Sequence, residues 1–248
     1  MQQASYYPND QFTSQIISLR GFLIGVAALL ILLFIGLRLM PEESTPLMAK
    51  VTSLLCPTLF AAAFGAYAGR NLRGWLPFIG IFIGVFVGML VISALGGSLL
   101  ASLLLLPWGF VAGMMLGPLV SMAIEMEGPM IVFEALTGTT AVMMLTALIV
   151  FATGINFSFL MPLLFLGLMG LIVVGLIGIF VRFSRTVNIV YSIIGLALFA
   201  GYFLFDFFRA TKSSNTWENA TSLTIELYLD FANFFAFLLR LLLATRRR

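Results

Sequence analysis

Two aspartates, Asp206 and Asp230, lie within strongly apolar, aromatic-rich segments of the chain. Asp206 is in the stretch GYFLFDFFR (residues 201–209), and Asp230 is in LYLDFANFF (residues 227–235). A carboxylate facing lipid is costly, so both side chains are expected to face the interior of a helical bundle. The chain has no histidine and one cysteine, Cys56, which excludes histidine-based catalysis, histidine metal sites and an intramolecular disulfide.

The spacing of the two aspartates predicts that they lie at similar depth. Their midpoint falls within the polar stretch Ser213–Asn219. If the flanking apolar segments form an antiparallel hairpin there, both aspartates lie a similar number of residues from the turn, at about 1.5 Å of rise per residue. Asn215 followed by Glu218 resembles a capping box that would start the last helix near this turn. The hairpin allows the two carboxyl groups to meet, although spacing alone does not set the rotation of either helix.

Two carboxyl groups that meet in an apolar site cannot both ionise cheaply, so such a pair would share a proton. A divalent cation can replace that proton, and Ca²⁺ accepts carboxylate oxygens in flexible geometry. Acid would then expel the metal, giving a pH sensor that needs no histidine. Alternatively, each aspartate only caps a broken helix or bonds a backbone amide. We expect no resident cofactor and treat Ca²⁺ as an ion bound or transported by Asp206 and Asp230.

The composition indicates an integral membrane protein. Of the 248 residues, 61% are hydrophobic and only 9% are charged, whereas a soluble domain carries about 25% charged residues. The mean hydropathy is +1.12. The net charge of +3 comes from basic residues near segment ends, which argues against nucleic-acid binding because a binder gathers such residues on one face. The expected surroundings are a lipid bilayer.

Eight apolar stretches approach the length of about 20 residues that a membrane-spanning helix needs. They cover residues 21–40, 51–69, 76–97, 100–124, 129–152, 158–181, 187–209 and 219–243. We therefore predict an all-α, polytopic integral membrane bundle of seven or eight helices in one domain, residues 21–243. A polar tail (residues 1–20) precedes the domain and a basic tail (residues 244–248) follows it. Residues 76–124 carry no charge and form either two spans or one span with a re-entrant piece.

Glycines at intervals of four predict close helix packing, because missing side chains let two backbones approach. Lining of a substrate path is the alternative. The ridges are Gly80, Gly84 and Gly88; Gly109, Gly113 and Gly117; and Ala61, Gly65 and Gly69. Most basic residues near span ends, Lys50 and Arg209 among them, are expected to anchor the chain at the membrane surface. Glu134, about one turn inside a span, is ambiguous between structure and function.

From about residue 100 to 243 the chain resembles the Bax inhibitor family, the transmembrane Bax-inhibitor-motif proteins. The resemblance is carried by YFLFD (residues 202–206), by LYLDFANFFAFLLR (residues 227–240), by GPMIVFEALTGT (residues 128–139) and by NIVYSIIG (residues 188–195). It implies a helical bundle of six or seven spans around a central C-terminal helix, so an eighth span would be an addition, expected within residues 41–99.

The resemblance also implies a function, namely Ca²⁺ leak across the membrane gated by protonation of an aspartate pair. Asp206 and Asp230 fall on the two family positions. A family arginine that latches this pair corresponds to Arg70. The expected function is thus pH-sensitive Ca²⁺ leak.

The alternative is a regulator that binds and restrains a membrane partner, such as an AAA-type protease or a cell-death protein. An intramembrane aspartyl protease is the poorest reading, because no Gly-x-Gly-Asp motif surrounds either aspartate, so we expect no enzyme. The bacterial inner membrane is the preferred location, with the endoplasmic-reticulum membrane as the alternative.

Overall fold

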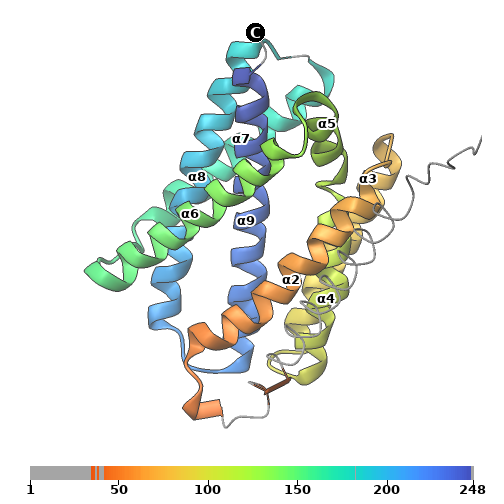
Figure 1. The fold of residues 1–248 in the computed structure, drawn as a ribbon. Helices are drawn as coiled ribbons and strands as arrows, with labels where there is room; N and C mark the ends of the chain where they lie inside the picture. Colours follow the sequence, from red (N-terminus) through yellow and green to blue (C-terminus); the bar gives the residue numbers. More distant parts are fainter. Residues whose placement is uncertain (1–34, 37, 39–41, 182, 247–248) are drawn as a thin grey trace, which may run out of the picture.

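The computed structural model describes residues 35–36, 38, 42–181 and 183–246, and all regular structure in this part is helical (Figure 1). From residue 42 onward the elements are the 3-10 turn η1 (Glu42–Ser44), α2 (Leu47–Gly69), α3 (Trp75–Ala94), α4 (Leu99–Met114), α5 (Gly117–Glu127), α6 (Met130–Thr153), α7 (Leu160–Phe180), α8 (Arg185–Lys212) and α9 (Trp217–Arg246). The predicted all-helical class is therefore confirmed.

Seven of the predicted apolar stretches correspond to helices. Six single helices are long and apolar enough to cross a membrane, and α4 with α5 forms a pair bent by 51° that raises the number to as many as seven. The chargeless region 76–124 is thus α3 followed by a broken helix. The predicted span 21–40 lies outside the described residues except for positions 35, 36 and 38, and the tail 1–20 lies wholly outside them. Helix α9 continues to Arg246, so residues 244–246 of the predicted tail are helical.

Helix α9 is the central element of the bundle, as Figure 1 shows. It packs against α2, α6 and α8, and also contacts α3, α4 and α5. Its middle carries the fully buried Tyr228, whose ring meets Trp108 of α4 edge to face with 5.0 Å between centroids. The Trp108 Nε1 atom donates to the Val85 carbonyl oxygen of α3 at 2.9 Å. Asp230, two residues further along on a different face of α9, is also buried, so the middle of the helix is enclosed on more than one side.

Helices α2 and α4 cross at the predicted glycine ridges. A Cβ atom built on Gly65 would collide with the backbone of Phe110, and one on Gly113 would collide with the backbone of Ala62. Close packing is therefore the role of these ridges. The α3 ridge differs, because a Cβ atom on Gly80 would meet nothing within 4 Å. That part of α3 faces outward.

The turn between α8 and α9 is fixed to the start of α2. Lys50 is fully buried, and its Nζ atom donates to the backbone oxygen and the Oδ1 atom of Asn215, both at 3.0 Å. Lys50 therefore has a structural partner that its position near the end of a span does not predict. Helix α9 begins at Trp217, near the turn as predicted, and the hydroxyl of Thr216 accepts from the Asn219 backbone amide at 3.2 Å.

Candidate functional site

Asp206 and Asp230 lie on facing surfaces of α8 and α9, and the structure brings them together. Their exposed fractions are 5% and 6%, and their side chains are within hydrogen-bonding reach of each other. The antiparallel hairpin turns between Lys212 and Trp217, close to the midpoint that the sequence indicates. Phe203, one turn before Asp206, packs on Phe234, one turn after Asp230, with 5.8 Å between ring centroids. This aromatic contact sets the rotation of the two helices that spacing left open.

The contact between the two carboxyl groups requires a proton. Two ionised carboxylates have only acceptor atoms, so a hydrogen bond between them needs one protonated partner. The Oδ2 atom of Asp230 is buried and has no hydrogen-bond donor among the described residues. A buried acceptor without a donor is costly. This oxygen is therefore a natural position for a proton or a metal ion.

Arg209 and Glu226 form an ion pair beside the aspartates, which the sequence analysis missed. Arg209 follows Asp206 by three residues on α8, and Glu226 precedes Asp230 by four residues on α9. Each pair of neighbours therefore shares one helix face. The sequence could have predicted this pair, because the midpoint between Arg209 and Glu226 is nearly the same as the midpoint between the two aspartates. The interpretation of Arg209 as a surface anchor hid it.

Arg70 lies elsewhere. It is exposed at the end of α2, and its guanidinium group stacks on the ring of Tyr67 at 3.9 Å. The opposite end of α2 is the one that contacts the α8–α9 turn, through Lys50. Arg209, which pairs with Glu226, is one helical turn from Asp206 on α8. The structure thus brings together two of the three predicted site residues and puts a different arginine beside them.

The aspartates offer an open rather than a closed metal site. The described part of the chain contains no group of three or more histidine, cysteine, aspartate or glutamate side chains that could hold a metal ion. Two carboxylates provide at most four oxygen atoms, whereas Ca²⁺ takes six to eight oxygen ligands, many of them from water or backbone carbonyls. The donor chemistry fits Ca²⁺, and the small number of protein ligands suits an ion in passage.

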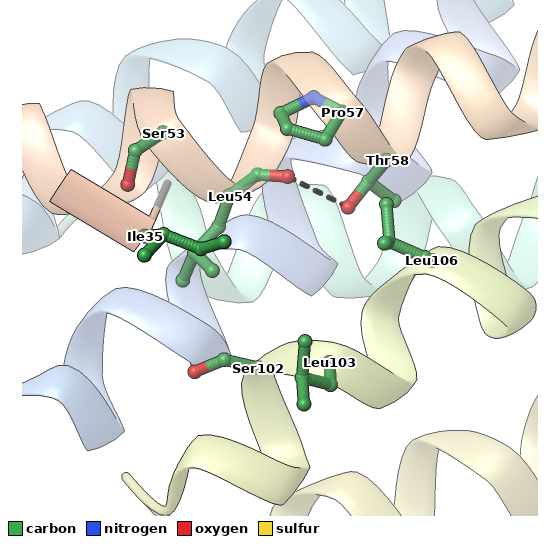
Figure 2. A pocket seen from close by; sticks show the side chains of 8 residues that line it. All are labelled: Ile35, Ser53, Leu54, Pro57, Thr58, Ser102, Leu103 and Leu106. Atoms are coloured by element: carbon green, nitrogen blue, oxygen red, sulfur yellow. Dashed lines mark hydrogen bonds between the residues drawn. The ribbon is translucent and has the colours of Figure 1, made fainter. Parts of the chain in front are cut away.

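A cavity between α2 and α4 is a poorer candidate (Figure 2). It has a volume of about 200 Å³. Its hydroxyl groups are used within their own helices, since Thr58 donates to the Leu54 carbonyl at 2.7 Å and Ser102 to the Ser98 carbonyl at 3.3 Å. The lining is therefore effectively apolar. The cavity is bounded by Ile35, Ser53, Leu54, Pro57, Thr58, Ser102, Leu103 and Leu106.

The ambiguous Glu134 has a structural partner. At the beginning of α6 it pairs with Arg246 at the end of α9. The pair is partly exposed, with side-chain exposures of 36% and 38%, and it ties the last turn of the central helix to its neighbour. It resembles the Arg209–Glu226 pair in composition and exposure but has no aspartate pair beside it.

The comparisons agree with the fold. A family model described as "Inhibitor of apoptosis-promoting Bax1" matches residues 44–248, which confirms the resemblance and extends it toward the N-terminus. An uncharacterised membrane protein of Vibrio cholerae serotype O1 is 32% identical over 142 residues, or 55% of this chain and 62% of that protein. The match thus spans less than two thirds of this relative. The family match begins at residue 44, so the predicted apolar stretch 21–40 lies outside the matched residues.

Proposed function

The chain belongs to the family of inhibitors of apoptosis-promoting Bax1, and on this basis we propose that it mediates a pH-sensitive Ca²⁺ leak through the pair Asp206 and Asp230. The observation that carries the proposal is the contact between two buried carboxyl groups in the apolar interior of a membrane bundle. Intramembrane acids that face a bundle interior mark ion pathways and proton relays. The proposal involves no chemical reaction and no resident cofactor.

The carboxyl pair supports both the choice of ion and its regulation. Carboxylate oxygens are preferred Ca²⁺ ligands, and the buried Oδ2 atom of Asp230 has no donor among the described residues. Protons and Ca²⁺ compete for the same oxygens, so metal affinity falls as the solution becomes more acidic. Ca²⁺ would therefore pass more readily when the pair is deprotonated, and acid would close the pathway.

Ca²⁺ flux in proteoliposomes tests the proposal. Purified protein is reconstituted with a Ca²⁺ indicator inside, and entry is followed for the native protein, Asp206→Asn and Asp230→Asn. Asparagine keeps the size and the hydrogen bonding of the site but removes the charge that attracts the ion. We expect either substitution to reduce the flux about tenfold or more, because a charged ligand is lost from a two-ligand site.

The matched control is Glu134→Gln, which neutralises a carboxylate of α6 that pairs with Arg246 at the far end of α9. Its flux should equal that of the native protein. Native flux in both aspartate variants would overturn the proposed mechanism. A flux lost equally in Glu134→Gln would show that the aspartates have no special role.

A second candidate function is supported by helix α3. Only 6% of the 18-residue apolar window of this helix is buried inside the protein. A Cβ atom built on Gly80 would meet nothing within 4 Å, and one built on Gly84 would meet a side-chain atom of Val111 at 3.9 Å. Small residues on an open helix face permit close approach of another membrane helix. The chain would then bind and restrain a membrane partner, such as a protease or a cell-death protein. Gly80→Leu should reduce partner recovery in native-membrane pull-downs without changing Ca²⁺ flux.

The location belongs to the same proposal. The protein is an integral membrane protein, and its relative is a bacterial membrane protein. We place this chain in the bacterial inner membrane. Fractionation of the native host's membranes, with detection of the protein by antibody, tests this placement, and recovery with the outer membrane would contradict it.

A further inference from the structure

The ion pair Arg209–Glu226 stands between the aspartates and the α8–α9 turn. Arg209 is three residues nearer the turn than Asp206, and Glu226 is four residues nearer than Asp230, which corresponds to about 5 Å along each helix. The aspartate pair and the ion pair each have one residue on α8 and one on α9. A cation that approaches the aspartates from the turn side therefore meets Arg209 and Glu226 first.

Burial changes sharply between the aspartate pair and the ion pair. The aspartates have exposed fractions of 5% and 6%, whereas the side chains of Arg209 and Glu226 are 39% and 30% exposed. The ion pair thus lies at the boundary between the buried site and the accessible turn region. This is the position in which a fixed charge controls entry most strongly, because screening declines toward the interior.

Arg209 has three acidic groups in its neighbourhood. It is paired with Glu226, and Asp206 and Asp230 each lie about one helical turn from a member of that pair. Asp206 is its neighbour on the same face of α8 at a spacing of three. Glu226 is held in place by Ser222, whose hydroxyl donates to the Oε1 atom at 3.3 Å. The guanidinium group therefore lies between Glu226, on the side of the turn, and Asp206, on the side of the buried pair.

We propose that Arg209 is an electrostatic gate for cations that reach the aspartate pair from the turn side, and that Glu226 is the counter-ion that holds this gate away from the pair. The inference rests on the proposed Ca²⁺ leak and names its regulating residues. Arg209 repels an approaching divalent cation, and Glu226 offsets that repulsion. Without Glu226, the guanidinium group turns to Asp206 and competes with Ca²⁺ for its oxygens.

The two single substitutions are expected to act in opposite directions. Arg209→Gln removes the repelling charge and leaves Glu226 as an additional acceptor, so Ca²⁺ flux should rise about three- to tenfold for one unit charge at this range. Glu226→Gln frees Arg209 to engage the aspartates, so flux should fall by a similar factor. The double variant lacks both charges, and its flux should lie within about twofold of the native value, since neighbouring effects are not additive.

Matched controls separate a gate from a merely structural ion pair. Lys212→Gln removes a positive charge one turn further along α8, where the ammonium group lies over the Phe208 ring. Glu134→Gln breaks the similarly exposed pair with Arg246. Neither should change the flux by more than about twofold, because charge effects fall with distance. A structural role would instead lower the flux in both Arg209→Gln and Glu226→Gln.

The experiment uses the full chain in proteoliposomes at low ionic strength, with Ca²⁺ as the only probe ion. Opposite changes in the two single variants support the gate. Flux that depends on the aspartates but is unchanged, or reduced alike, in the Arg209 and Glu226 variants overturns the gate and leaves the proposed leak standing. Native flux in Asp206→Asn and Asp230→Asn overturns the leak, and the gate with it.

Discussion

The ammonium group of Lys50, near the start of α2, donates to both the backbone oxygen and the side-chain oxygen of Asn215, in the turn between α8 and α9, at 3.0 Å each. The Nδ2 atom of Asn215 in turn donates to the Thr45 carbonyl at 2.9 Å. The ring of Trp217 lies 5.5 Å from the Lys50 Nζ atom. This cluster joins the hairpin that carries the aspartates to the first described membrane helix.

The first prediction concerns this junction. Asn215→Ala removes hydrogen bonds to a buried ammonium group and should destabilise the protein by about 2–3 kcal/mol. The measurement is reversible unfolding of purified protein in mixed micelles. Asn233→Ala is the matched control, because the exposed Asn233 bonds only the Leu229 carbonyl of its own helix, at 2.8 Å. Equal stability losses in the two variants would show that the junction is not special.

The second prediction separates stability from function at the aspartate pair. Asp230→Asn replaces a buried acid with an amide that can donate to Asp206 without a shared proton. We expect the variant to be as stable as the native protein or more stable by about 0–2 kcal/mol, as is common when buried charge is removed. Tryptophan fluorescence on heating measures this. A midpoint well below the native one would mean that the pair is a structural element.

The third prediction uses two glycines, each from a ridge with an interval of four residues, whose surroundings differ. Gly113→Ala places a Cβ atom against the Ala62 backbone of α2 and should cost about 3 kcal/mol, because two helix backbones must separate. Gly80→Ala adds a methyl group where nothing lies within 4 Å, and stability should change by less than about 1 kcal/mol. The unfolding assay above compares them. A similar loss in both variants would contradict the assignment of the α2–α4 crossing.

The fourth prediction concerns pH and ligand binding. Ca²⁺ binds the deprotonated pair, so added Ca²⁺ should raise the unfolding midpoint more at about pH 8 than at about pH 6, because protons compete with Ca²⁺ for the same oxygens. Stabilisation follows from binding to the folded state alone. Asp206→Asn should abolish the Ca²⁺ effect at both pH values. A Ca²⁺ shift that is independent of pH, or that persists in this variant, would place the ion elsewhere.

The arrangement of the aspartate hairpin could be predicted from the sequence because two independent signals agree. Polarity marks the turn at residues 213–216, and the positions of Asp206 and Asp230 on either side of it give matched depth. Apolar length likewise locates each described helix to within a few residues. Helix rotation could not be predicted, since it depends on contacts between distant side chains such as that of Phe203 with Phe234.

The partners of two basic residues could not be predicted from the sequence, for the same physical reason. Lys50 and Arg209 lie near span ends, where long basic side chains usually reach the membrane surface. Here each finds a partner from a distant part of the chain, Asn215 and Glu226 respectively. Such partners are set by tertiary structure. Arg70 was indicated by the family resemblance and not by a contact. In the structure its guanidinium group stacks on the Tyr67 ring, and Arg209 pairs with Glu226 beside the aspartates.

The central position of α9 has a consequence for synthesis of the protein. The helices that surround α9 precede it in the chain, and the contact of Lys50 with Asn215 joins positions 165 residues apart. At about 5–20 residues per second, the ribosome needs roughly 10–30 s to make that stretch. During this interval α2 is already made while the helix that completes its core is missing. The packing of α2 is therefore completed only when the final hairpin enters the bundle.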